Sequence, residues 1–352
     1  MYFKLACCAI LAIPIVVWTR YSYLISNFDK PGVWDAALDA GTCVHALDEP
    51  AGSFYCLPTA IMIGAQKCGS TAFANILLDH PQINGRTGGN AFTASRFKQD
   101  FWSRTFRTRR ISWRQYLRQP AFLLREEDLH RGVITFEKSP DYMASNQAMS
   151  EIRFLMPSVK LLAILRDPVT RAYSAYQWQC RKGRVLRRQN AVELVENFWI
   201  DILPFHLPWA ADCDDPSVFD QYLETAELRD YESMDSIIGK GMYAKQLRDA
   251  MQMFGSSSIF VVLLEDFSSN RTRVLRATLD FLDLEPWNPL IGDDELSDSE
   301  ENRGLYRTPM SERARRVLEE AYEEPNRQLE ELLAALQFPL TIKSLWVRRF
   351  QI

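Results

Sequence analysis

Short apolar runs alternate with amphipathic stretches over most of the chain. Four apolar runs bounded by turn residues are typical of buried strands, at residues 59–64, 133–138, 160–166 and 258–265. Apolar residues at helical spacing predict helices at about 71–78, 146–156, 168–180, 189–202, 240–254, 270–283 and 311–336. Strands that alternate with helices predict an α/β fold, in which helices cover both faces of a parallel sheet.

The beginning of the chain has a different character. Residues 5–18 carry no charge, and counting to Ile25 with Arg20 at the interface reaches the ~17–25 residues of a membrane span. We therefore predict an uncleaved signal-anchor helix. A cleaved signal peptide and a buried helix of the globular domain remain alternatives, although the segment has a poor cleavage site. The predicted parts are a cytosolic stub and signal-anchor at 1–25, a stem at 26–57 and a globular domain at 58–352.

The seven cysteines fit a chain that enters an oxidising lumen. Two of them, Cys7 and Cys8, lie in the apolar segment. The other five are Cys43, Cys56, Cys68, Cys180 and Cys213. One pair, 43 and 56, flanks a stretch that could close as a hairpin-like loop, and the pair 180 and 213 flanks an insertion. We expect two disulfides and one leftover thiol. The single glycosylation sequon, at residues 270–272, adds little by itself.

A glycine-containing loop, residues 63–71 (IGAQKCGST), joins the first strand to the first helix. Glycines let backbone amides approach a phosphate, and the helix start adds partial positive charge. Lys67 brings a mobile charge, while Ser70 and Thr71 bring hydroxyl donors. The loop is not a Walker A motif, because its second glycine is followed by serine and its lysine comes earlier. It indicates an anion site, with a plain strand-to-helix turn as the alternative.

A second strand, turn and helix also have the features of a phosphate site. Arg166, at the end of the run 160–166, can make a charge-assisted bond to a phosphate. Pro168 suits the first turn of a helix. Ser174 lies two helical turns further on and can donate to the same group. The alternative partner of Arg166 is Asp167 or another acid.

These two segments resemble parts of the Golgi carbohydrate sulfotransferases, which use 3′-phosphoadenosine 5′-phosphosulfate (PAPS). CLPTAIMIGAQKCGSTAF at 56–73 is similar to the 5′-phosphosulfate loop of that family, and LLAILRDPVTRAYSAY at 161–176 to its 3′-phosphate-binding element. Three further elements are similar, namely FEKSP at 136–140, GMYAKQL at 241–247 and EAYEEPNRQL at 320–329. The likeness covers roughly 56–340. It lies between the N-acetylgalactosamine 4-sulfate 6-O-sulfotransferase and the heparan sulfate branches, so the acceptor stays open.

The resemblance implies a sulfotransferase fold with a P-loop-like sheet and in-line sulfuryl transfer from PAPS to a glycan hydroxyl, without a metal ion. On this basis we assign catalytic roles to Lys67, Glu137 and Lys138, with Lys67 as the candidate that stabilises the leaving oxygen. It also implies donor contacts from Lys67, Cys68, Gly69, Ser70, Thr71, Arg166, Ser174 and Tyr243. Together with the anchor, it places the protein in the Golgi membrane as a single-pass type II protein with a lumenal catalytic domain.

The general base is where this chain departs from its relatives. Golgi relatives carry a glutamate after their His-Pro pair, and here Gly89 or Asn90 takes that position. Asparagine cannot accept a proton at neutral pH. Three interpretations remain open: Glu137 is the base, Asp100 is the base after a shift in register, or the protein binds PAPS and transfers slowly or not at all. Glu137 could instead form an ion pair with Lys138 or Arg166.

Charge is unevenly distributed along the chain, although the formal net charge is only -4. Residues 96–125 hold nine Lys or Arg and one acid, and residues 181–188 hold five more. The aromatic residues Trp102, Trp113, Tyr116 and Trp178 lie among or beside them. Arginine binds sulfate and carboxylate, and aromatic faces stack on sugars, so we predict a groove for an anionic polysaccharide. A solvated charged face is the alternative, and residues 293–301 form an acidic loop.

Composition excludes several classes of protein. With 47% hydrophobic and 24% charged residues, the chain is in the range of ordinary globular proteins. The mild net acidity and the lumenal address argue against nucleic acid as a partner. The four histidines, at 45, 80, 130 and 206, do not cluster, so we expect no metal site. Besides a glycan sulfotransferase, a weak PAPS-binding lectin or scaffold and a sulfotransferase for protein tyrosine or a small molecule remain possible.

Overall fold

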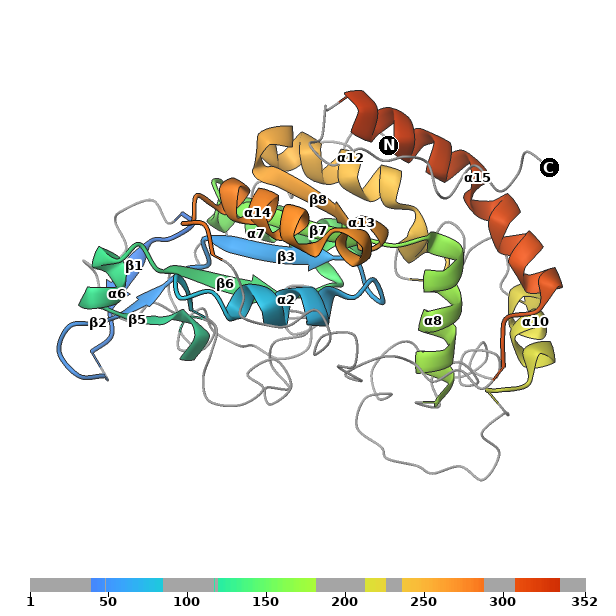
Figure 1. Ribbon diagram of the computed structural model, residues 1–352, viewed down its shortest axis with the longest axis horizontal. Helices are drawn as coiled ribbons and strands as arrows, with labels where there is room; N and C mark the ends of the chain where they lie inside the picture. The colour runs from blue at the N-terminus through green and yellow to red at the C-terminus, as the bar shows by residue number, and fades with distance from the viewer. Residues whose placement is uncertain are drawn as a thin grey trace, which may run out of the picture.

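A five-stranded parallel sheet forms the centre of the protein (Figure 1). The computed structural model describes residues 39–84 except 48, residue 117, and residues 120–181, 213–225, 236–287 and 308–335. The strands are β3 (Ala60–Gly64), β4 (Ile83–Asn84), β6 (Ile134–Lys138), β7 (Lys160–Leu165) and β8 (Ile259–Leu263), in the spatial order β4-β6-β3-β7-β8. All four strands expected from apolar runs are confirmed, and only the short β4 lacked such a signal.

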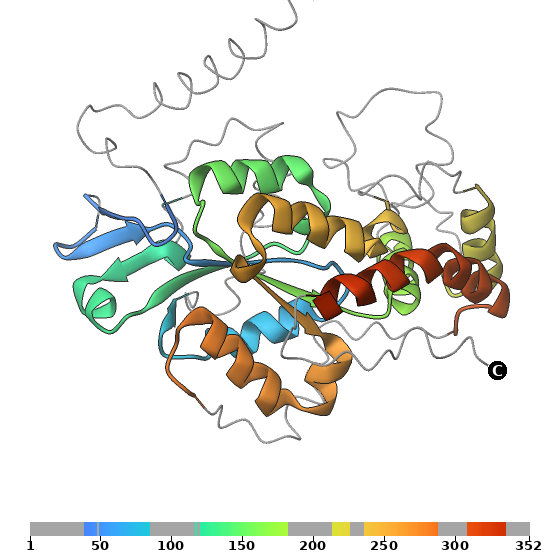
Figure 2. The ribbon, with the colours of Figure 1, turned by 90° about the horizontal axis from the view of Figure 1, so that it is seen from above.

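Helices cover both faces of this sheet, as the sequence predicts (Figure 2). One face carries α2 (Ser70–Leu78), α13 (Leu264–Ser269) and α14 (Arg271–Leu282), and the other carries α7 (Asn146–Leu155) and α12 (Tyr243–Phe254). Every residue of β3 and β8 is buried. Strands that are buried on both faces need apolar side chains at every position, which explains their uninterrupted apolar sequence.

The described part of the chain also forms a smaller antiparallel sheet. It contains β1 (Cys43–His45), β2 (Ser53–Cys56) and β5 (Leu123–Arg125), in that order. Cys43 lies opposite Cys56 in the β1–β2 register, and the two form the first expected disulfide. Part of the segment that we assigned to the stem, residues 43–56, is therefore folded.

A second hydrophobic cluster lies at one end of the molecule. It joins α8 (Pro168–Arg181), α10 (Pro216–Thr225) and the long α15 (Glu312–Ala335). The rings of Tyr176 and Phe219 pack against each other within it, tilted by 41° with their centroids 4.4 Å apart. The second expected disulfide, between Cys180 and Cys213, fastens the end of α8 to the chain that leads into α10.

Shorter helical turns complete the described part of the chain. They are η2 (Pro120–Phe122), α6 (Glu126–His130), η3 (Tyr142–Ala144), η4 (Gly239–Gly241) and η5 (Ser256–Ser258). Within the ranges given above, no helix is long and apolar enough to cross a membrane. Several predictions lie outside the described residues: the anchor at 1–25, the helix at 189–202, the acidic run at 293–301, Asp100, Gly89 and Asn90, and most of the basic segments at 96–125 and 181–188.

Candidate active site

The loop between β3 and α2 has the backbone shape of an anion site. Gly69, with a φ of 77°, stands in the left-handed region directly before α2, and a Cβ added there would lie 2.9 Å from Cδ1 of Leu264. Lys67 also has a positive φ of 67°. No side chain caps α2 at Gly69. The first N–H groups of the helix therefore carry their partial positive charge into the loop.

The carboxyl ends of two neighbouring strands bring cations to this loop. Lys138, the last residue of β6, donates from Nζ to Oγ1 of Thr71 at 2.8 Å. Arg166 follows β7 and donates from Nη1 to the backbone oxygen of Lys67 at 3.5 Å. Because β3 lies between β6 and β7, its loop occupies the point where the connections diverge to the two sides of the sheet. Ligands bind at such points in parallel α/β sheets.

Lys138 is a buried cation whose pKa reflects that position. Its side chain is held at only 4% exposure. Its pKa falls from 10.5 to about 8, chiefly because the side chain is buried; the carboxylate of Asp141 opposes this shift and the charge of Lys67 adds to it. Two lysines thus share one small region. A bound anion would relieve both the desolvation and the repulsion between them.

Lys67 is also close to an aromatic ring. Its Nζ lies 5.9 Å from the centroid of the Trp178 ring, within the range of a cation–π contact. Trp178 belongs to α8, the helix that begins directly after the Arg166-Asp167 corner. The ends of β3 and β7 and the body of α8 therefore surround the same lysine.

Glu137 faces the opposite side of the sheet from Lys138. Successive strand residues point to opposite faces, and Lys138 points towards α2. Glu137 is buried and accepts a hydrogen bond at Oε1 from the hydroxyl of Tyr142, in η3, at 2.7 Å. The structure therefore does not bring the Glu137 carboxylate together with the Lys138 ammonium. It also gives Glu137 a tyrosine partner, where the sequence suggested Lys138 or Arg166.

Tyr243 and Cys68 support the loop from behind. Both side chains are buried, and the Cys68 Sγ lies 3.4 Å from the Tyr243 hydroxyl. That hydroxyl also donates to the backbone oxygen of Arg166 at 3.1 Å. Burial raises the pKa of the Cys68 thiol to about 11, so it is a neutral group at physiological pH. Both side chains link the loop to the end of β7, and their expected contacts with the donor stay predictions.

The remaining predicted donor residues lie on the two helices that follow the motifs. Ser70 begins α2 and Ser174 lies on α8, and both side chains are almost fully buried. Thr71 is partly exposed and already accepts the bond from Lys138. The structure thus brings the first motif, the second motif and Lys138 to a single place.

Sequence reasoning missed an ion pair beside the loop. Lys240, in η4, binds Oδ1 of Asp141 from Nζ at 2.7 Å, and both side chains are largely buried. Gln66 of the loop donates to the other carboxylate oxygen at 3.5 Å. The pair therefore connects the residues after β6 to η4 and to the loop. The partners come from segments far apart in the chain, so no local spacing pointed to them.

Arg171 is a second residue that we did not assign to the site. It lies on α8, is fully buried, and donates from Nη2 to the backbone oxygen of Ile237. Its Nε and Nη1 have no hydrogen-bond partner among the described residues. The available signal in the sequence was its place between Arg166 and Ser174 in the second motif. Charged residues are rarely fully buried without a partner, so its burial sets it apart in the structure.

His80 has a structural role. His80, just after α2, is buried, accepts from the backbone N–H of Gln82 at Nδ1, and lies with Nε2 3.0 Å from the backbone oxygen of Glu285. Burial lowers its pKa. In the described ranges, no three His, Cys, Asp or Glu side chains are placed to hold a metal ion together.

Comparisons with known proteins agree with this geometry. The family model described as "Sulfotransferase domain" matches residues 57–302. A Mus musculus protein named bifunctional heparan sulfate N-deacetylase/N-sulfotransferase 4 is 25% identical over 311 residues, which cover 83% of this chain and 31% of that protein. Heparan sulfate glucosamine 3-O-sulfotransferase 3A1, also from Mus musculus, is 29% identical over 186 residues, or 49% of this chain and 42% of that protein. The chain thus spans less than half the length of these curated relatives.

One solved structure shares the fold. A sulfotransferase from Alicyclobacillus acidocaldarius aligns with a TM-score of 0.51 and 21% identity, over 79% of this chain and 96% of that one. This likeness agrees with the parallel sheet and its covering helices.

Proposed function

Because the chain belongs to the sulfotransferase domain family, we propose that it transfers a sulfuryl group from PAPS to a hydroxyl of a glycan. The acceptor is an acidic polysaccharide of the glycosaminoglycan class. Two relatives are named for heparan sulfate, and the segments 96–125 and 181–188 are strongly basic. The enzyme works in the Golgi lumen, anchored by residues 1–25.

One observation carries this proposal, namely the convergence of cations at the N-terminal end of α2. Lys138 reaches Thr71 from β6, Arg166 reaches the backbone of Lys67 from β7, and Lys67 lies in the loop itself. Sulfuryl transfer needs a donor held in line and charge stabilised on the leaving oxygen. Lys67 and Lys138 supply that charge at a fixed place, because the ends of two strands position them.

The other loop residues bind and orient the donor. The N–H groups at the start of α2 and the hydroxyls of Ser70 and Thr71 hold the 5′-phosphosulfate. Arg166 and Ser174 hold the 3′-phosphate, and a guanidinium suits a phosphate because it can bind two oxygens at once. Cys68 and Tyr243 keep the loop in register with β7.

A second candidate function is donor binding with slow or no transfer. The position of Glu137 favours it, because this carboxylate is engaged with Tyr142 on the face away from Lys138. With Gly89 or Asn90 where relatives have glutamate, Asp100 is then the remaining candidate base. A non-carbohydrate acceptor, such as a tyrosine side chain, is a third possibility that the test below separates.

The test is transfer of radiolabelled sulfate from PAPS by the full chain purified from a secretory host. Acceptors are heparan sulfate, chondroitin sulfate, their desulfated forms and tyrosine peptides. We expect label on a glycosaminoglycan, and a loss of roughly 100-fold in the Lys138→Gln variant. Lys245→Gln, at an exposed lysine paired with Asp249, is the matched control and should keep the wild-type rate.

The other outcomes of this test favour one of the other candidate functions or refute the donor site. Binding of adenosine 3′,5′-bisphosphate without transfer to any acceptor favours the second candidate, and labelled tyrosine peptides favour the third. A Glu137→Gln variant with a full transfer rate would exclude Glu137 as the base. If the protein shows no binding of the nucleotide and no transfer to any acceptor, the proposed donor site is refuted.

A further inference from the structure

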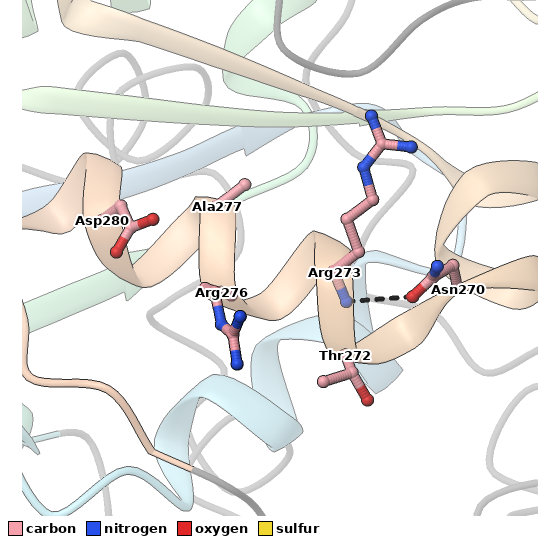
Figure 3. Close-up of a pocket in the computed structure, with 6 residues that line it drawn as sticks. All are labelled: Asn270, Thr272, Arg273, Arg276, Ala277 and Asp280. Atoms are coloured by element: carbon pink, nitrogen blue, oxygen red, sulfur yellow. Dashed lines mark hydrogen bonds between the residues drawn. The ribbon is translucent and has the colours of Figure 1, made fainter.

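Asn270 is an exposed asparagine that caps α14. Its Oδ1 accepts a hydrogen bond from the backbone N–H of Arg273 at 3.1 Å (Figure 3). Thr272, two residues after Asn270, is also exposed. Asparagine, any residue except proline, and threonine form the acceptor sequence for N-linked glycans. The sulfotransferase site has no use for this motif.

The cap and a glycan can coexist on the same side chain. Capping uses the amide oxygen, whereas an N-linked sugar is attached to the amide nitrogen, Nδ2. A glycosylated amide keeps its carbonyl, so the bond to Arg273 survives the modification. Asn270 and Thr272 border an open groove of about 350 Å³ that continues along α14 past Arg273, Arg276 and Asp280 (Figure 3). A first sugar therefore has room on this face.

The disulfides provide the second observation. Two disulfides are formed in separate parts of the fold. Cys43–Cys56 lies in the small antiparallel sheet, and Cys180–Cys213 lies at the second hydrophobic cluster. Such bridges persist in secreted and lumenal proteins and are rare in the cytosol. A chain that forms them passes through the compartment in which N-linked glycans are added.

We propose that Asn270 carries an N-linked oligosaccharide. Attachment forms a bond between Nδ2 and the anomeric carbon of the first sugar. The bond from that carbon to the diphosphate of a lipid-linked oligosaccharide breaks, and Nδ2 loses one proton. The oligosaccharide covers the outer surface of α14. The anionic acceptor of the enzyme is therefore bound elsewhere, although Arg273 and Arg276 are both exposed on this helix.

The test uses the full chain expressed in a secretory host and separated by mass before and after enzymatic removal of N-glycans. We expect the wild-type chain and Thr272→Ser to lose the mass of one glycan, since serine also serves in the acceptor sequence. Thr272→Ala and Asn270→Asp should show no change. Asn270→Asp keeps the capping oxygen, so it removes the glycan without weakening α14.

A gain-of-sequon variant controls for delivery to the lumen. Ser256→Asn creates an acceptor sequence with Ser257 and Ser258 in the exposed turn η5. A glycan on this variant at η5 with none at Asn270 would overturn the proposal. Absence of any glycan from both chains would overturn it as well, because the chain then never reaches the glycosylation machinery.

Discussion

Lys138 should take up a proton when the donor site is filled. Burial and the neighbouring charge of Lys67 lower its pKa from 10.5 to about 8 in the free protein. A bound anion reverses both effects, because it replaces lost solvation and screens the repulsion between the lysines. Binding of adenosine 3′,5′-bisphosphate therefore raises the pKa of Lys138, and the side chain gains a proton wherever it was neutral before.

The size of the uptake follows from the pKa of the free protein. With a pKa of about 8, roughly half of the Lys138 side chains are neutral at pH 8. Full protonation on binding then takes up about 0.5 protons per nucleotide at pH 8, about 0.1 at pH 7 and about 0.9 at pH 9. The phosphates of the nucleotide add little above pH 8, because their last proton leaves near pH 6.

Isothermal titration calorimetry in buffers of different ionisation enthalpy measures this uptake directly. The Lys138→Gln variant should bind more weakly and lose the rise between pH 7 and pH 9, whereas Lys245→Gln should behave as wild type. Cys68 does not interfere, since burial raises its pKa to about 11. Equal proton uptake by wild type and Lys138→Gln at pH 9 would refute the assigned environment of Lys138.

Three further results are expected. The pKa of Lys138 is lower in the folded chain than in the unfolded one. The unfolding free energy of wild type, relative to that of Lys138→Met, should therefore rise between about pH 8 and 10.5. Denaturant titrations at several pH values measure this difference. In urea unfolding, Gly69→Ala should cost about 1–2 kcal/mol for its positive φ and a smaller amount for the shift of the Leu264 side chain, whose Cδ1 lies 2.9 Å from the added Cβ. Gly132→Ala, also at positive φ, should show only the first cost. Removal of the Cys180–Cys213 bridge, which closes 33 residues, should lower the unfolding free energy by about 3–4 kcal/mol, and unchanged melting under reduction would contradict this.

The central sheet was predictable because its strands are buried on both faces. A strand such as β7 needs apolar side chains at nearly every position, and that demand appears as a short apolar run. The antiparallel sheet left no such signal. β1 and β2 have only three and four residues. β2 pairs with β5, so that Ser53 lies opposite Arg125, a residue far away in the sequence. Local periodicity in the sequence does not predict pairing between strands that are so far apart along the chain.

Some residues of the site could be identified from the sequence, whereas others could be identified only from the structure. Lys67 and Arg166 were identified because their motifs are local, and the loop and turn that present them are contiguous in sequence. The Asp141–Lys240 pair depends on folding that joins residues 99 positions apart. The burial of Cys68 and Tyr243 behind the loop is likewise a property of packing, since their sequence positions suit a residue in front of it equally well.

The opposite orientations of Glu137 and Lys138 follow from the geometry of β6 alone. Adjacent residues of a strand point to opposite faces of the sheet, and β6 is regular through Lys138. The hydrogen bond from Lys138 to Thr71 assigns one face to the loop, and the bond from Tyr142 to Glu137 assigns the other to η3. A base that acts beside Lys67 and Lys138 must reach the loop from the α2 side or from beyond the edge of the sheet. The face that Glu137 occupies is therefore an argument against this residue as the base.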